Sequence, residues 1–290
     1  MFKKMTGTNL KTGFCRKQTN RNTGIAIAAL CLCAAPPSAR AEDKEPAATP
    51  YRPTVSNPAE LSEPGWLELE MGWQRIRGGS DTRRDSLPLT AKLAFSEDWG
   101  VLVSTEAGIR RTDLSNTLFT GNGDTTVLLK HRFGGESEKN GAWGIEAGFK
   151  SPTARSTLGS GKSDYLLNLI YSVDRLGNRL DLNVNGTSIG AAGNGEGQTQ
   201  YGWAAALSRA LDDNWGVFGE FSGAYRSATP STSQFMAGAS YNVSKRIVVD
   251  AGMARGLSRA TQDWTAFVGG DRADGAAVVM THACRPGRRI

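Results

Sequence analysis

Apolar and polar residues alternate along most of the chain after Trp66. The pattern is clearest in four segments, where every second residue is apolar over about ten positions: residues 99–109, 143–149, 165–171 and 215–221. A period of two places successive side chains on opposite faces of a β-strand. Strands of this length also suit a tilted crossing of a membrane. These segments therefore predict long strands whose two faces meet different surroundings.

Eight further segments show a weaker form of the same alternation. They are residues 66–76, 85–95, 123–133, 179–187, 198–208, 232–241, 247–255 and 263–269. Together the segments predict an all-β fold, a transmembrane antiparallel up-and-down β-barrel of about 12 strands, and an even number returns both ends to one side of the membrane. A secreted β-sandwich alternates in the same way, so the period alone does not exclude it.

The predicted connections and the aromatic residues favour the barrel. Connections near 96–98, 174–178, 212–214 and 242–245 are short, and those near 77–84, 111–122, 151–162, 188–197 and 225–231 are longer. Aromatic residues gather at the strand ends beside both sets, such as Trp215 after a short connection and Tyr165 after a long one. Outer-membrane barrels have short periplasmic turns, long outer loops and two aromatic girdles. A connection near 134–141 is longer than this rule predicts.

The N-terminal residues 1–41 have the organisation of a signal peptide. A basic stretch precedes the apolar run 25–35, and Ala39-Arg40-Ala41 resembles a cleavage site. The run is shorter than the roughly 20 residues of a membrane-spanning helix. Residues 42–64 are rich in Pro, Ala, Glu and Thr without a sustained period, so we predict an extended periplasmic lead-in. The predicted barrel covers residues 65–269, and residues 270–290 form an atypical C-terminal tail.

Removal of this leader changes the charge balance. The leader holds seven of the 34 Lys and Arg residues and none of the 28 Asp and Glu residues, so the exported chain is nearly neutral. Binding to nucleic acid requires a clustered basic surface, which this composition gives no reason to expect. Of the four cysteines, only Cys284 lies beyond the leader, which excludes a disulfide within one exported chain.

Charged residues within the strands share one side of the predicted barrel. If the apolar residues of each strand face lipid, the alternating charged residues face inward. We expect these charged residues to line the lumen: Glu68, Glu70, Lys92, Glu106, Arg110, Lys130, Glu146, Lys150, Glu220 and Asp250. A basic residue at the lipid midplane costs about 2–4 kcal/mol, which explains the segregation. Two interpretations stay open: a polar conduit, or a closed lumen filled by ion pairs such as Glu106 with Lys130.

Residues suited to catalysis or metal binding are scarce. His131 falls on the predicted lipid face and His282 lies in the tail, so neither gathers the several ligands that a metal site needs. An outer-membrane Ser-His hydrolase requires a positioned base, and His131 points the wrong way for that role. The Gly-rich stretches 121–124 and 159–162 lack the full P-loop and EF-hand spacings. We predict no catalytic residues, no metal site and no cofactor.

Several motifs, taken in order, resemble one family. They are Arg52-Pro53, Asn57-Pro58, the stretch 64–70, Leu87-Pro88, the stretches 123–133 and 148–153, and Leu158-Gly159-Ser160-Gly161. Together they resemble the outer-membrane transporter family labelled meta-pathway of phenol degradation, over residues 50–269. The resemblance implies a barrel in the bacterial outer membrane that passes small hydrophobic or aromatic compounds, and it carries over no functional residues.

The end of the chain departs from that family pattern. Barrels of this kind usually finish on an alternating strand with a terminal aromatic residue, whereas residues 271–290 are interrupted by Asp, Arg, Gly and Pro. One hypothesis is a reading-frame slip near Gly269 or Gly270, which would leave the last strand with an exposed edge. The alternative is a natural tail after a short closing strand.

The sequence therefore predicts an outer-membrane channel rather than an enzyme. Its expected partners are outer-membrane lipid, the barrel-assembly machinery and small aromatic or hydrophobic solutes. The alternative function is a closed structural or surface-interaction barrel that transports nothing. The sequence leaves open the substrate, the oligomeric state and whether a loop such as 188–197 plugs the lumen.

Overall fold

The computed structural model describes residues 46–79, 81–133 and 140–274. The chain divides into the units Met1–Arg40 and Ala41–Ile290, and every described residue belongs to the second unit. The predicted signal peptide, residues 275–290 and most of the connection near 134–141 lie outside these ranges.

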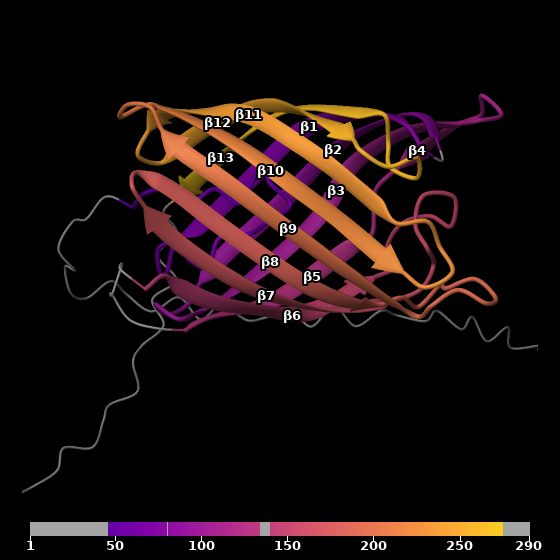
Figure 1. The fold of residues 1–290 in the computed structure, drawn as a ribbon, viewed down its shortest axis with the longest axis horizontal. Coiled ribbons are helices and arrows are strands. Elements are labelled where there is room, and N and C mark those ends of the chain that lie inside the picture. The colour runs from indigo at the N-terminus through magenta and orange to yellow at the C-terminus, as the bar shows by residue number, and fades with distance from the viewer. Residues whose placement is uncertain (1–45, 80, 134–139, 275–290) are drawn as a thin grey trace, which may run out of the picture. The chain divides into compact units, whose positions relative to one another are not determined.

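Long antiparallel strands follow one another around a single closed sheet (Figure 1). The ring closes because β1 pairs with β2 on one side and with β13 on the other. Twelve strands form it: β1 (Leu67–Gly78), β2 (Asp81–Ala94), β3 (Trp99–Asp113), β5 (Thr125–Phe133), β6 (Ala142–Ser151), β7 (Asp164–Arg175), β8 (Asn178–Ser188), β9 (Thr199–Ala210), β10 (Trp215–Arg226), β11 (Thr232–Ser244), β12 (Ile247–Gly256) and β13 (Trp264–Asp274). A short strand, β4 (Leu118–Gly121), pairs only with β3. The predicted all-β barrel is confirmed, and the sandwich alternative is wrong because the sheet closes on itself.

The two ends of the barrel differ in their connections. At the short-turn end, β2–β3, β7–β8, β9–β10 and β11–β12 are joined by two to four residues, whereas the long-loop end carries residues 152–163, 189–198 and 257–263. Leu176 and Gly177 both have positive φ, 53° and 72°, which fits a tight two-residue hairpin turn. Asp212 accepts hydrogen bonds from the backbone N–H groups of Asn214 and Trp215, and these bonds lower the pKa of Asp212.

The connection predicted for residues 77–84 is wrong. β1 and β2 continue to Gly78 and from Asp81, so the hairpin between them is tight. Asp85 pairs with Arg75 on the neighbouring strand β1 at 2.6 Å and with Arg83 on its own strand at 2.5 Å. Ion pairs replace apolar contacts here, so hydrophobic alternation gave no sign of the strands.

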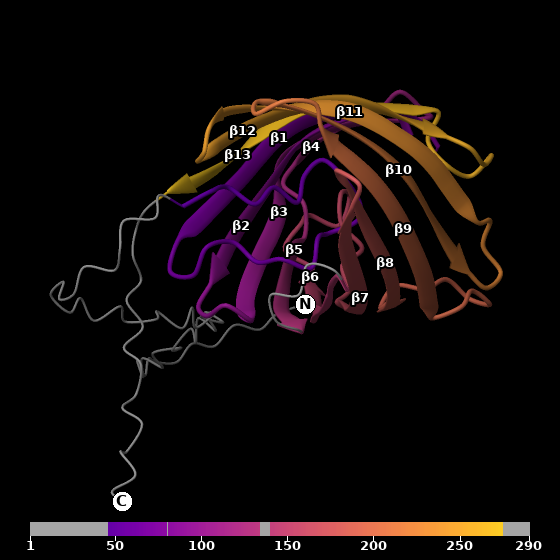
Figure 2. The same cartoon turned by 60° about the vertical axis from the view of Figure 1, so that its left-hand side comes forward.

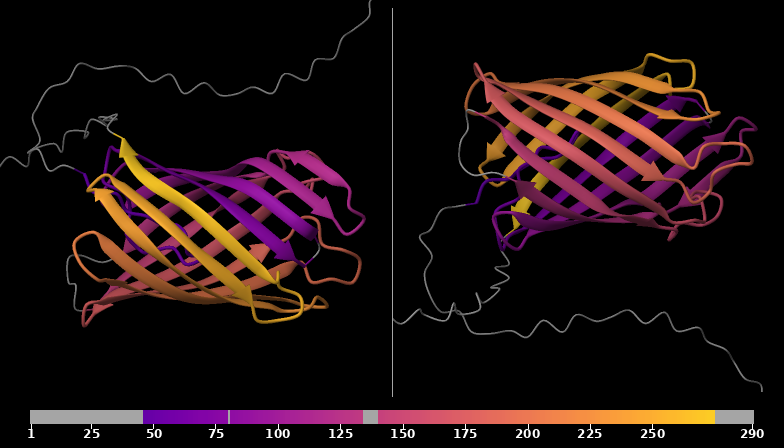
Figure 3. Two further views of the ribbon diagram at one scale, coloured as in Figure 1. Left: turned by 90° about the horizontal axis from the view of Figure 1, so that it is seen from above. Right: turned by 60° about the horizontal axis from the view of Figure 1, so that its bottom comes forward.

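The last strand also extends further than predicted. β13 runs five residues beyond Gly269 to Asp274 and pairs with β1 from Leu67↔Asp274 to Arg77↔Trp264 (Figure 3, where the yellow strand lies beside the indigo one). The exposed edge expected at Gly269 is therefore wrong. Asp271 interrupts the apolar pattern because its side chain lies in the lumen, where it faces Lys92 at 3.3 Å.

The outer face is apolar between two sets of aromatic side chains. At the short-turn end, the ring centroids of Trp143 and Tyr171 lie 4.7 Å apart, and those of Trp215 and Tyr241 lie 4.9 Å apart. Exposed aromatic residues near the long-loop end include Phe149, Tyr165, Tyr201 and Tyr225. Among the described residues, no helix is long and apolar enough to cross a membrane.

Residues 46–64 lie inside the barrel, not in the periplasm as predicted (Figure 2). The Ala48 N–H donates to the carbonyl of Lys245 and the Gly65 N–H to that of Ala94, so this internal segment enters and leaves at the short-turn end. It contains no helix or strand, as predicted. Backbone groups without secondary structure need other hydrogen-bond partners when buried, and the polar lumen supplies them.

Candidate functional site

A buried ion cluster anchors the start of the internal segment. The Lys92 ammonium lies 2.7 Å from Glu68, 2.6 Å from Glu70 and 3.3 Å from Asp271. It also donates to the Thr49 carbonyl at 2.6 Å. The three carboxylates have oxygens within 4.8 Å of one another, an arrangement that could hold a metal ion. Lys92 lies among them, however, so its ammonium supplies the positive charge that an ion would bring.

The carboxylates of the same cluster also hold the backbone of the segment. The Thr49 N–H donates to Glu68 at 2.8 Å, and the Tyr51 N–H donates to Glu70 at 2.6 Å. Hydrogen bonds between a charged group and the backbone are stronger than neutral ones. The inward charges of β1 and β2 therefore position the segment as well as neutralise each other.

A second pair of buried charges lies close to the ring of Tyr51. Lys130 on β5 is fully buried, 3.2 Å from Glu146 on β6, and donates to the Pro58 carbonyl at 2.5 Å. The centre of the Tyr51 ring lies 4.2 Å from the ammonium group of Lys92 and 4.0 Å from that of Lys130. Cations are attracted to the faces of aromatic rings, most strongly when they are removed from water.

The hydroxyl of Tyr51 donates to the carbonyl of Glu60 at 2.5 Å, which ties two parts of the segment together. Burial raises the pKa of Tyr51 well above its usual value, and the carboxylates of Glu146, Glu68 and Glu70 raise it further. The phenol is therefore held in its neutral, donating form.

The middle of the segment is bound from the opposite side of the barrel. The backbone N–H of Val55 and that of Ser56 donate to the fully buried Glu220 on β10, at 3.1 and 2.8 Å. The Asn57 side chain donates to both carboxylate oxygens of Glu146, and its backbone exchanges hydrogen bonds with Asn183 on β8. The segment is thus held by strands on both sides of the lumen.

Arg52 lies where the segment meets β1, β12 and β13. Its guanidinium is 3.4 Å from Asp250, the longest of the ion pairs that join the segment to the strands. It rests against Gly72 and Gly269, a cross-strand pair on β1 and β13. A Cβ at Gly72 would lie 2.1 Å from Arg52 Nη1, so only glycine leaves room for this side chain.

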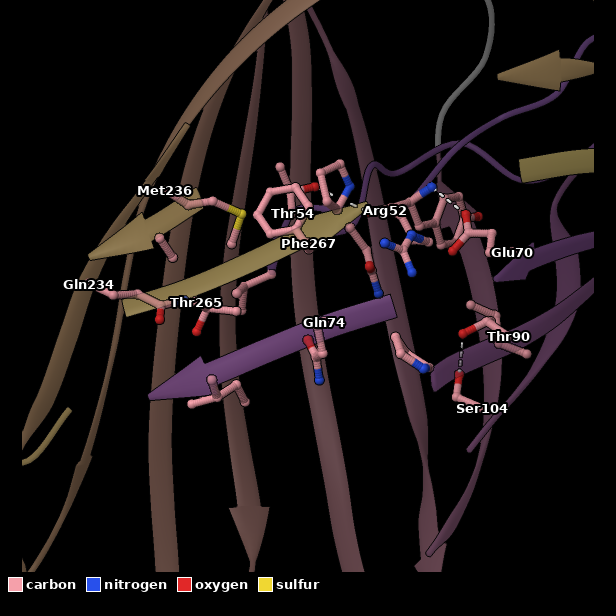
Figure 4. Close-up of a pocket in the computed structure, with 18 of the residues that line it drawn as sticks. Arg52, Thr54, Glu70, Gln74, Thr90, Ser104, Gln234, Met236, Thr265 and Phe267 are labelled. Carbon is pink, nitrogen blue, oxygen red and sulfur yellow. Dashed lines mark hydrogen bonds between the residues drawn. The ribbon is translucent and has the colours of Figure 1, made fainter. Parts of the chain in front are cut away.

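Two cavities meet at Arg52, Pro53 and Thr54. The long-loop cavity has a volume of about 330 Å³, and the short-turn cavity about 390 Å³. Figure 4 shows the residues that line the first, with Arg52 and Thr54 of the internal segment among side chains from several strands. The internal segment therefore divides the lumen into two chambers.

The long-loop cavity has mainly neutral walls. Its apolar lining includes Leu102, Leu128, Met236 and Phe267, and its polar lining includes Gln74, Thr90, Ser104, Gln234 and Thr265. Arg52 and Glu70 are the charged residues in that lining. These neutral residues were not predicted from the sequence, where only charged residues stand out against the alternating pattern. The same strand phase that selected Glu106 on β3 also directs Leu102 and Ser104 inward, so the signal was present.

The structure places nine of the ten predicted lumen residues on the inner face. Glu68, Glu70, Lys92, Lys130, Glu146, Glu220 and Asp250 contact the internal segment or one another. Lys150 lies nearer the long-loop end, 2.7 Å from Asp164 and 3.4 Å from Asp124. Glu106 pairs with Arg84. The suggested Glu106–Lys130 pair is wrong, since Lys130 lies opposite Gly100 in the register of β3 and β5.

Arg110 is the exception, because its side chain lies on the outer face. The register of β2 and β3 shifts between Ser86 and Pro88, which places one extra residue on β3. A Cβ at Gly108 would point toward Leu87, whose side chain is exposed on the outside. Ile109 then takes the inner side and Arg110 the outer side, opposite Asp85. A bulge of this kind reverses every side chain that follows it.

His131 lies on the outer face near the short-turn end, as predicted. Its ring stacks on Trp99 with centroids 4.1 Å apart and meets the edge of Phe133 at 4.3 Å. One ring nitrogen contacts the Asp98 carbonyl at 3.0 Å. These contacts make His131 part of the aromatic girdle, away from the lumen.

Comparison with known proteins bears on the fold. No family model and no curated protein matches the sequence. An outer membrane channel from Pseudomonas putida F1 has a similar structure, with a TM-score of 0.59 and 11% identity over 74% of this chain and 98% of that one. The barrel thus has the fold of an outer-membrane channel.

Two other solved structures are less similar. The KdgM porin has a TM-score of 0.48 and 12% identity over 71% of this chain and 99% of that one. The CymD monoaromatic hydrocarbon channel has a TM-score of 0.45 and 11% identity over 73% and 89%.

Proposed function

We propose that this protein is an outer-membrane channel, without catalytic activity, that passes small hydrophobic or aromatic compounds. The main observation in support of this proposal is the long-loop cavity. Its volume suits a small molecule, its apolar side chains suit a hydrocarbon or ring, and its amides and hydroxyls can orient a polar substituent. The resemblance of the sequence to the phenol meta-pathway transporters supports the same class of solute.

The outer face supports a location in the bacterial outer membrane. Apolar side chains such as Met71, Leu169 and Val184 are more than half exposed, and aromatic residues lie at both ends of the strands. An apolar band between aromatic girdles is the usual surface of a barrel in lipid. In this proposal the partners are outer-membrane lipid and the machinery that inserts barrels, and the long loops face the exterior.

A conductance measurement on the full-length protein in planar bilayers tests the role of the internal segment. The variant Arg52→Ser removes a large side chain that lines both cavities, so its single-channel conductance should rise by about twofold or more. Gly72→Ala should act in the same direction, since the added methyl displaces the guanidinium. Gly186→Ala, where a Cβ meets nothing within 4 Å, should leave the conductance unchanged.

Solute flux into proteoliposomes tests the proposed solute class. Phenyl glucoside and methyl glucoside share one sugar and differ in the aromatic ring, so a swelling assay compares them directly. We expect the phenyl compound to enter faster despite its larger size. Phe267→Leu keeps an apolar side chain but removes the ring, and should reduce that preference. Faster entry of methyl glucoside would exclude an aromatic preference.

A closed barrel without transport is the second candidate function. The observation that favours it is the binding of residues 49–59 to buried side chains from both sides of the lumen. If neither glucoside enters and neither Arg52→Ser nor Gly72→Ala conducts, the protein is a closed barrel that does not transport solutes.

A further inference from the structure

Five arginines lie together on the outer face at the long-loop end. This outer arginine cluster consists of Arg75 and Arg77 on β1, Arg83 on β2, Arg110 on β3 and Arg255 on β12. The strand register places them on neighbouring strands. Arg77 on β1 lies opposite Arg83 on β2 and Trp264 on β13, and Trp264 in turn lies opposite Arg255 on β12. Adjacent strands lie about 4.8 Å apart, so the cluster spans neighbouring strands of one continuous surface.

The direction of these side chains follows from their neighbours. Gly72 faces the lumen, where Arg52 lies against it, so Trp73 and Arg75 face outward. The guanidinium of Arg75 indeed lies 5.1 Å from the centre of the Trp73 ring. Arg83 pairs with Asp85 on the same face, and the β-bulge turns Arg110 outward as described above.

The cluster carries an excess of positive charge. Asp85 is the acidic group within it and pairs with Arg75 and Arg83. Asp263 lies beside Gly78 at its edge. Within the described part of the chain, the side chains of Arg77, Arg110 and Arg255 have no hydrogen bond or ion pair, so they are available to an external anion.

An apolar hollow adjoins the cluster on the same face. It has a volume of about 330 Å³ and lies between β11, β12 and β13, where Phe235, Ala237, Met253, Arg255 and Trp264 line it. Met253 is 58% exposed and Phe235 is 37% exposed, so the hollow opens outward. Arg255 belongs to both features, which places positive charge directly beside an apolar recess.

We propose that the cluster and the hollow together bind a phosphorylated glycolipid of the outer leaflet. Its phosphates would contact Arg77, Arg110 and Arg255, because guanidinium groups match phosphate oxygens in pairs. One acyl chain would fill the hollow. This inference rests on the proposed outer-membrane location, in which the long-loop end lies at the outer interface. A lipid is favoured over a soluble anion because charge and apolar recess occur side by side.

Native mass spectrometry of the full-length protein in detergent tests this site, with bisphosphorylated lipid A as the probe. The wild type should retain this lipid about tenfold more strongly than lipid A from which both phosphates have been removed. The double variant Arg77→Gln/Arg255→Gln should lose that preference. The matched control Arg209→Gln/Arg272→Gln, at the short-turn end, should keep it.

Three outcomes would overturn the inference: equal retention of both lipids by the wild type, equal loss in the control variant, or displacement of lipid A by inorganic phosphate. The last would show that a soluble anion is the ligand. The test does not depend on transport, because retention is measured in detergent. Arg77→Gln/Arg255→Gln should conduct like the wild type. If the wild type does not conduct but still retains lipid A, the channel proposal is wrong and the lipid site is supported.

Discussion

At the residue scale, the lumen depends on charges that are buried and paired. Lys92 has three carboxylates around it and is almost fully buried, as are Glu68 and Glu70. Removing an ion from water is costly, and its partners recover that cost only while the whole set is present. Loss of the single ammonium therefore leaves several uncompensated negative charges together.

The variant Lys92→Gln should destabilise the barrel by about 3–5 kcal/mol, the cost of breaking a buried ion pair. Urea unfolding in detergent, followed by the mobility of unboiled samples on a gel, measures this change. Lys150→Gln is the control, because that side chain is 24% exposed and its ion pairs are partly solvated. It should lose about 1 kcal/mol or less. Equal losses in both variants would contradict the role assigned to the Lys92 cluster.

At the element scale, each strand separates lipid from lumen by its period of two. The rule holds along β7, where Leu167 and Leu169 are about half exposed on the outside while Asn168 and Ile170 are buried. It fails locally in β3, where a bulge adds one residue and reverses the phase after Gly108. Period and bulge together decide which residues meet lipid.

The outer face of β7 provides a test of the membrane location. Leu169 lies at the middle of its strand, opposite Ile145 and Val184. Leu169→Arg should therefore reduce the free energy of folding into lipid vesicles by about 2–4 kcal/mol. Leu176→Arg is the matched control, since Leu176 lies in a turn and is 95% exposed. If Leu169→Arg folds into vesicles as well as this control, the outer face of β7 does not lie in lipid.

At the scale of the whole molecule, the internal segment joins strands that are distant around the ring. Thr49 and Tyr51 bind β1, Ser56 binds β10, and Asn57 binds β6 and β8. The segment and the barrel therefore stabilise each other, and residues 52–54 of the segment line both cavities.

An alkaline titration tests whether the segment occupies the lumen in solution. An exposed tyrosine ionises near pH 10 in both the folded and the unfolded chain. In the folded barrel, however, burial and nearby carboxylates raise the pKa of Tyr51. Because the pKa of Tyr51 is higher in the folded than in the unfolded protein, the neutral phenol contributes to the stability of the folded state. That contribution is complete below about pH 10 and is lost as the pH rises above it.

Ultraviolet absorbance of the folded barrel should therefore show one of the six tyrosines ionising later than the rest. Tyr51→Phe should remove that late step and leave the others in place. Simultaneous ionisation of all tyrosines in the wild type would mean that the segment leaves the lumen.

The sequence by itself determined the strands, their two faces and most inward charges. Each depends on a local period of two, which one strand such as β6 or β7 displays without reference to its neighbours. Only the tertiary structure decided the rest. The partner of Lys130, the outward position of Arg110 and the strand end at Asp274 all depend on the register between neighbouring strands. Residues 46–64 have no period at all, so their place in the lumen depends on partners that only the closed ring brings together.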